Sequence, residues 1–100
     1  MASDGETRIM FTSSAKLIFH IPYAMSLKDK RQVRRSIIDK ARNKFNASIA
    51  EVDTQDMWKT LSVGVAVVSG SVSHAQELMD EIIRFMEDNS EAELIGIEIA

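Results

Sequence analysis

The hydrophobic pattern of the chain occurs twice, and this repetition limits the folds that are open to it. Each half reads as a stretch of alternating apolar residues, a helical stretch with a polar cap, and a second alternating stretch. Alternation is typical of strands, and apolar residues three or four positions apart are typical of amphipathic helices. The order βαββαβ predicts an α+β, ferredoxin-like domain, in which two helices cover one face of a four-stranded antiparallel sheet.

The first half is expected to hold a strand at residues 10–21, a helix that begins near Ser26, and a short strand at residues 47–52. Pro22 ends the first strand, and Ser26 followed by Asp29 is similar to a capping box. The apolar side of the expected helix is made of Leu27, Val33, Ile37, Ile38, Ala41 and Phe45.

The second half is expected to hold a Val-rich strand at residues 58–69, a helix that begins near Ser73, and a strand at residues 94–99. Ser73 with Gln76 repeats the capping signal. The apolar stripe of this helix consists of Ala75, Leu78, Met79, Ile82, Ile83 and Met86. Ile95, Ile97 and Ile99 are expected on one face of the last strand.

The size of the chain predicts a single domain. With 100 residues and no Cys, we expect one globular domain at residues 10–100 after a mobile polar tail at residues 1–9. The absence of Cys excludes a disulfide framework, a thiolate nucleophile and Cys-ligated zinc. No apolar run approaches the roughly 18 residues of a membrane span, and residues 1–8 do not read as a secretory leader. We therefore expect a cytoplasmic protein without membrane contact.

Charge is concentrated in two opposite segments. Residues 26–45 hold eight basic residues and two acidic ones, whereas residues 77–100 hold eight acidic residues and one basic one. The formal net charge of −3 hides this asymmetry. Because fields between surface charges are screened within about 10 Å at ordinary salt, the basic segment can still meet phosphate or an acidic protein surface.

The basic segment is the main functional clue. A helix N-terminus surrounded by Lys and Arg is a good anion site, and RNA is the candidate polyanion. The candidate nucleic-acid or anion-binding residues are Lys28, Lys30, Arg31, Arg34, Arg35 and Arg42. We expect the helix to make the phosphate contacts, because residues 61–68 carry no aromatic side chain on which a base could stack. The simpler alternative is a solvated charged face.

The sheet face without helices is a second candidate surface. The residues expected there are Ile18, His20, Gly64, Ala66, Val68 and Gly96. The strand at residues 58–69 is apolar on both faces and carries small residues, so we expect a homodimer that uses this face. A mixed face that is exposed to solvent is the alternative.

Catalytic motifs are missing from the sequence. Glu51, Asp53 and Asp56 could hold Mg²⁺ through oxygen ligands, but Asp side chains that form a turn are the plainer interpretation. His20 and His74 have no neighbouring nucleophile, and the chain has no phosphate-binding loop, nucleophile elbow or zinc spacing. We expect no catalytic residue, cofactor or metal, and the alternative is a metal-dependent enzyme that uses the three acids.

Several short motifs occur in a specific order. They are His20-Ile21-Pro22, the run S-L-K-D-K-R at residues 26–31, the run F-N-A-S-I-A-E-V-D at residues 45–53, Gln55-Asp56 with Trp58, and G-V-A-V-V at residues 64–68. Together they resemble the YlxP-like family, a bacterial domain family of unassigned function. The resemblance extends from about residue 17 to residue 87.

The resemblance implies a ferredoxin-like fold and a role near the ribosome or its RNA, because members are often encoded beside translation and ribosome-maturation factors. Ser13 and Ser14 depart from the more apolar, Gly-containing first strand of the family, which leaves the start of that strand open. We expect a small, non-catalytic accessory module that binds RNA phosphates in ribosome assembly or translation. The alternative is a protein-interaction or self-assembling module whose basic helix contacts an acidic protein surface.

Overall fold

A computed structural model describes residues 10–100, so the expected tail at residues 1–9 lies outside the described residues. The elements are β1 (Phe11–His20), α1 (Leu27–Arg34), η2 (Arg35–Asp39), α2 (Lys40–Lys44), β2 (Ser48–Glu51), β3 (Thr60–Ser69), α3 (Val72–Asp88) and β4 (Glu93–Ile99). Ser13 and Ser14 lie within β1, which settles where this strand begins.

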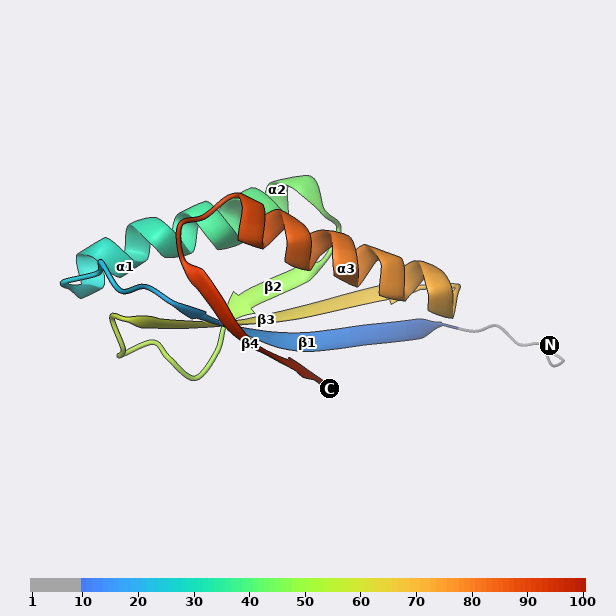
Figure 1. Cartoon of the computed structure of the whole chain (residues 1–100). Helices are drawn as coiled ribbons and strands as arrows, with labels where there is room; N and C mark the ends of the chain where they lie inside the picture. Colours follow the sequence, from blue (N-terminus) through green and yellow to red (C-terminus); the bar gives the residue numbers. More distant parts are fainter. Residues whose placement is uncertain (1–9) are drawn as a thin grey trace, which may run out of the picture.

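The four strands form one antiparallel sheet in the order β2-β3-β1-β4, and the helices lie on one face of it (Figure 1). β1 and β3 occupy the centre and pair along their whole length, from Phe11 opposite Ser69 to His20 opposite Thr60. The predicted α+β, ferredoxin-like fold is therefore confirmed.

The core lies between the sheet and the helices. Alternate residues of the central strands are buried there, with Leu17 and Phe19 of β1 opposite Val63 and Leu61 of β3. The helices contribute fully buried side chains such as Ile37. Burial of these apolar groups supplies most of the free energy that holds the two layers together.

The first helix is continuous from α1 to α2 but contains a π-helical turn, η2. Its sheet-facing residues Val33, Ile37, Ala41 and Phe45 are spaced four apart. In a regular α-helix each such step drifts by about 40° around the axis. The wider π turn, with its i→i+5 hydrogen bonds, offsets this drift and keeps these side chains on the sheet.

Helix capping follows the sequence at one helix and departs from it at the other. Ser26 Oγ accepts a hydrogen bond from Asp29 N at 3.1 Å, as predicted. The α3 cap is Ser71 rather than Ser73, because Ser71 Oγ accepts from His74 N at 3.3 Å. The prediction that Leu27 belongs to the buried side of the first helix is also wrong, because Leu27 is 41% exposed. It begins α1 at an end of the molecule where loops replace the sheet (Figure 1).

β4 is an edge strand with an incompletely covered inner face. Ile97 and Ile99 lie opposite Leu17 and Ala15 of β1 and therefore share the helix-facing side of the sheet, yet both isoleucines are exposed. The reason is that α3 packs against β1 and β3 rather than against β4. Within residues 10–100, none of the helices combines the length and the apolar character that crossing a membrane requires.

A basic helix face and its anchored loop as the candidate functional site

Lys30 is buried rather than presented to solvent. Its ammonium nitrogen lies 2.6 Å from Glu51 Oε2 and also donates to the backbone carbonyl oxygens of Thr54 and Met57. An ammonium group has three protons, and these three acceptors satisfy them. The prediction that Lys30 binds an external anion is therefore wrong, because Glu51 neutralises its charge and the chain covers it.

Glu51, the last residue of β2, is the centre of this buried network. Its side chain is 6% exposed, and Oε2 also accepts from Thr54 Oγ1 at 2.9 Å. Oε1 lies 3.6 Å from Nη1 of Arg34, whose side chain is 41% exposed. A buried carboxylate is tolerated only when cations and hydrogen-bond donors surround it. Arg34 thus lies at the border between the network and solvent.

The loop at residues 52–59 is fixed by the same network. Thr54 is buried, and its Oγ1 accepts from Ser62 N of β3 at 2.9 Å. At the other end of the loop, Lys59 O accepts from Ile21 N at 2.9 Å, and Lys59 Nζ donates to Pro22 O at 2.8 Å. Together with the bonds from Lys30, these contacts attach the loop to β1, β3 and α1.

Three of the predicted cations line the exposed face of the first helix, two of them in α1 and Arg35 at the start of η2. Lys28, Arg31 and Arg35 are exposed and spaced at i, i+3 and i+7, so they lie on one side of the helix. Within residues 10–100, no carboxylate oxygen lies within ion-pair distance of any of the three. We call these three residues the basic stripe.

Arg42 has an architectural role in addition to its charge. Its Nε and Nη2 donate to Ile49 O of β2 at 2.9 and 2.6 Å, and its Nη1 lies 3.9 Å from Asp39 Oδ1. The side chain is still 52% exposed. Arg42 therefore links α2 to β2 and does not belong to the basic stripe.

A small cleft separates α1 from the loop. It has a volume of about 170 Å³ and is lined by Leu27, Lys30, Arg31, Arg34, Glu51 and Gln55. Exposed cations of the helix form one wall, and the amide of Gln55, which can donate and accept, forms the other. The exposed cations on its wall suit an anionic group with polar edges, whereas Glu51 and Lys30 at its base already pair with each other.

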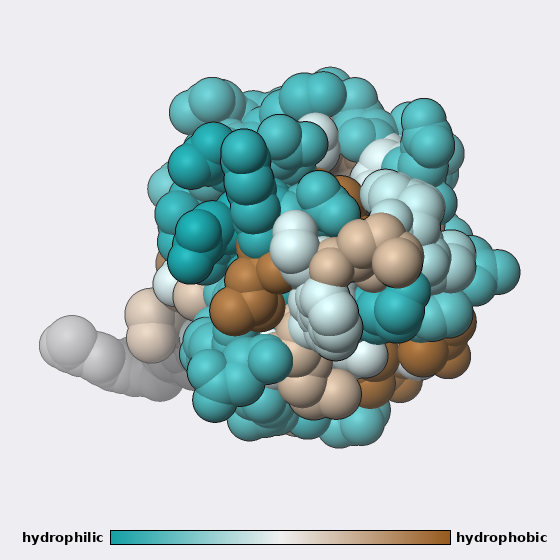
Figure 2. All heavy atoms as spheres, turned by 90° about the vertical axis from the view of Figure 1, so that its left-hand side faces the viewer, coloured by the Kyte–Doolittle hydropathy of each residue, from teal (hydrophilic) through white to brown (hydrophobic). Residues whose placement is uncertain are grey.

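The end of the molecule beside this cleft is apolar. Exposed hydrophobic residues come from the segments at 21–27 and 52–59, and they are Tyr23, Met25, Leu27, Met57 and Trp58. Figure 2 shows this end, where hydrophobic residues form a patch that hydrophilic ones border. Burial and the nearby charge of Glu91 raise the pKa of Tyr23 above its ordinary value of 10.0.

The sheet face opposite the helices carries the residues predicted for it. They are Ile18, His20, Gly64, Ala66, Val68 and Gly96. Position 96 favours glycine because a Cβ atom there would lie 3.3 Å from Cδ1 of Ile18, which is a tight contact. His20 Nδ1 lies 3.5 Å from Glu93 Oε1. The expectation that a second copy covers this face stays a prediction.

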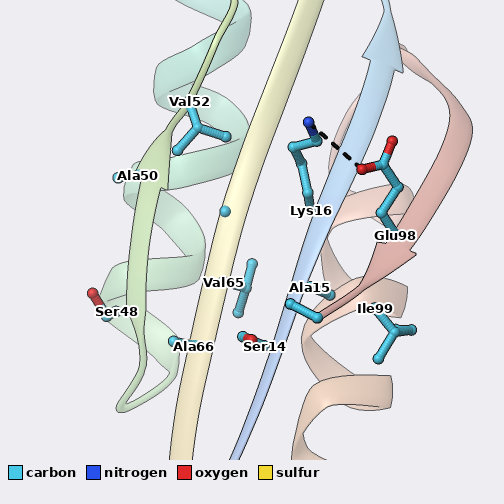
Figure 3. A pocket seen from close by; sticks show the side chains of 12 residues that line it. Ser14, Ala15, Lys16, Ser48, Ala50, Val52, Val65, Ala66, Glu98 and Ile99 are labelled. Carbon is cyan, nitrogen blue, oxygen red and sulfur yellow. Dashed lines mark ion pairs between the residues drawn. The ribbon is translucent and has the colours of Figure 1, made fainter.

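A shallow groove crosses this face (Figure 3). Its volume is about 430 Å³, and small side chains such as Ser14, Ala50 and Ala66 form its floor. Lys16 stands at its side, 2.8 Å from Asp53 Oδ2 and 3.6 Å from Glu98 Oε1. The hydrogen bond to Asp53, followed by the charges of Asp53 and Glu98, raises the pKa of Lys16 above 10.5.

The three acids that could hold a metal do not converge. Glu51 is enclosed with Lys30, whereas Asp53 pairs with Lys16 of β1. In the part of the chain from residue 10 onward, no group of three potential metal-ligating side chains is found. The cluster of Glu51, Asp53 and Asp56 is thus corrected: the backbone turns between them, with Asp53 at a φ of 67°, a conformation that Asp tolerates better than most residues.

The sequence suggests another role for Glu51, that of a metal ligand, and no site role for Gln55. A signal for Glu51 was present, because Lys30 falls in the apolar arc of the helix and a buried Lys needs a carboxylate partner. Glu51 is an acidic residue at the end of a short strand, where such a partner can reach the core. Nothing in the sequence indicates Gln55.

Comparisons with known proteins place the chain in a family. A family model described as a protein of unknown function, DUF503, matches residues 12–99. The chain is also 39% identical over 70 residues to the uncharacterized protein YlxP of Bacillus subtilis strain 168, a match that covers 70% of this chain and 76% of that protein. The resemblance seen in the sequence motifs is thereby confirmed, and the chain belongs to the DUF503 family of proteins of unknown function.

Proposed function

We propose that this protein is a small, non-catalytic accessory module that binds RNA phosphates through the basic stripe of α1, in ribosome assembly or translation. Arg34, at the edge of the cleft, adds a fourth cation that Glu51 partly neutralises. Lys30 and Arg42 support the site from within, because they hold the loop and β2 against the helix.

One observation carries the proposal: Lys28, Arg31 and Arg35 project from one helix face without a carboxylate partner among residues 10–100. Seven residues of α-helix rise about 10 Å, so the three charges follow one another along a line that an extended phosphate backbone can track. Cations near a helix N-terminus also oppose the helix dipole, and a bound anion relieves that repulsion.

The test is a salt titration of RNA affinity. The double variant Arg31→Ala, Arg35→Ala should bind a labelled structured RNA more weakly than the unmodified chain, with a similar loss for RNAs of different sequence. The slope of log affinity against log salt should flatten by about one unit for each phosphate contact removed. Fluorescence anisotropy measures both quantities.

The matched control is Lys40→Ala, Arg84→Ala, which removes the same number of charges from exposed positions outside the stripe. This variant should keep nearly the same slope of log affinity against log salt as the unmodified chain. Equal losses in the two double variants would mean that only net charge matters, and unmeasurable RNA affinity at low salt would eliminate the proposal. Association of the RNA-free protein that weakens with salt would favour the protein-interaction alternative.

A further inference from the structure

Trp58 is exposed on the loop at residues 52–59 and is the only tryptophan of the chain. Its side chain is 47% exposed, and that of the preceding Met57 is 49% exposed. Large aromatic side chains are normally removed from water when a protein folds. A half-exposed ring on a loop that the buried network holds in place is available to a partner.

The position of Trp58 is set by the buried network. Met57 O accepts from Lys30 Nζ, so the residue before Trp58 is attached to a buried side chain of α1. On its other side, Lys59 O accepts from Ile21 N. The ring thus projects from a segment that is held at both neighbouring residues.

The cleft of about 170 Å³ lies between the helix and the loop that carries Trp58, because Arg31 of the stripe lines it together with Arg34 and with Gln55 of the loop. A strand of RNA whose phosphates lie on α1 would pass the loop at this point.

We propose that Trp58 stacks on an unpaired nucleobase of the RNA whose phosphates contact the basic stripe. The ligand class is then single-stranded RNA or an RNA loop rather than an uninterrupted duplex, since bases inside a duplex offer no free face for stacking. This inference rests on the proposed function and makes it more specific. It does not use the sheet face, which lacks aromatic residues on β3.

The experiment uses the full chain and the intrinsic fluorescence of Trp58, which reports on this ring alone. Three probes are titrated: a single-stranded RNA oligonucleotide, a blunt duplex that contains the same strand, and inorganic polyphosphate. The single strand should quench the fluorescence most strongly. Polyphosphate should bind, as measured by competition with labelled RNA, but should leave the emission nearly unchanged.

The variant Trp58→Ala should weaken binding of the single strand by about 5- to 150-fold, the range expected for loss of one base–aromatic stack. Its affinity for polyphosphate should not change, and Trp58→Phe should restore most of the lost affinity. The matched control is Val72→Ala at the start of α3, which removes a hydrophobic side chain of similar exposure, 48%, outside the apolar patch and should have little effect.

The outcomes separate the inference from the proposed function. If the stripe variants lose RNA while Trp58→Ala binds like the unmodified chain and emission does not respond, the stacking inference fails and phosphate binding stands. If neither RNA nor polyphosphate binds, both fail. Quenching by polyglutamate as strong as that by the single strand would reassign Trp58 to a protein contact and overturn the inference. If Trp58→Ala does not fold, the inference is tested by the quenching pattern of the unmodified chain and by the RNA affinity of Trp58→Phe.

Discussion

Two side chains far apart in the sequence, Lys30 and Glu51, determine which of the neighbouring charges are free. The helical pattern places Lys30 within the apolar arc of the first helix, but it does not reveal the partner that makes burial possible. That partner is identified only by the approach of β2 to α1 in the folded chain. The sequence could therefore predict a basic helix, and the structure was needed to separate internal cations from available ones.

The Lys30 network should make a large contribution to the free energy of unfolding. Lys30→Met leaves Glu51 buried without its main counter-charge, and loss of one member of a buried pair costs about 3 kcal/mol or more. Urea denaturation measures the loss, and Lys40→Met, on an exposed lysine of the same helix, should change stability by less than about 0.5 kcal/mol. Similar effects of the two variants would contradict the assigned role of Lys30.

Tyr23, the only tyrosine of the chain, offers a direct pH measurement. Because its pKa is raised by burial and, to a smaller extent, by Glu91, the folded state holds the phenol proton more tightly than the unfolded state. Stability is therefore unaffected well below pH 10.0 and falls as pH rises through the pKa of Tyr23. Titration of the phenolate absorbance should give a pKa above 10.0.

Replacement of Glu91 separates the two causes of the Tyr23 shift. Glu91→Gln should lower the pKa of Tyr23 but leave it above 10.0, because burial is the larger cause. A pKa that does not change in this variant would show that the carboxylate does not act on the phenol.

At the scale of single elements, periodicity located all four strands and both helices, but it misjudged details that depend on backbone geometry. The π turn of η2 has no distinct signal in the sequence, because the four-residue spacing of Val33, Ile37 and Ala41 also fits the apolar stripe of a regular helix. At α3, Ser73 with Gln76 matches the capping-box pattern, whereas Ser71, which is followed three positions later by His74, does not. Only the extended backbone of Ser71 shows which of them acts as the cap.

The two serines provide a test of the cap assignment. Ser71→Ala removes the acceptor of the His74 N–H group and should lower the free energy of unfolding by about 1 kcal/mol. Ser73→Ala should have a smaller effect, because Ser73 lies inside the helix and contacts only Ser71 Oγ at 3.1 Å. Thermal denaturation of both variants compares them, and a larger loss for Ser73→Ala would contradict the assignment.

For the molecule as a whole, the order of elements was predictable because each half of the chain repeats one pattern, and two helices on one face follow from that order. The exposure of individual residues was harder to predict, since it depends on which strands each helix covers. β4 illustrates this: its inner isoleucines resemble core residues in the sequence but lie beyond the reach of α3.

The separation of charge across the molecule leads to a prediction about self-association. The basic stripe lies on α1, whereas Glu77, Asp80 and Glu81 are exposed on α3. If the stripe serves RNA, the RNA-free protein should keep the same association state at low and high salt, as measured by sedimentation. Oligomers that dissociate as salt rises would instead indicate contacts between the two faces of different copies.

The enclosure of Lys30 and the pairing of Arg34 have a kinetic consequence for the proposed complex. Because few cations are left to displace counterions, the proposed RNA complex should be weak at high ionic strength and should have a short residence time. Such a protein would visit a transcript repeatedly rather than stay as a permanent component. Short residence is expected of an accessory factor that dissociates from its RNA after it has acted.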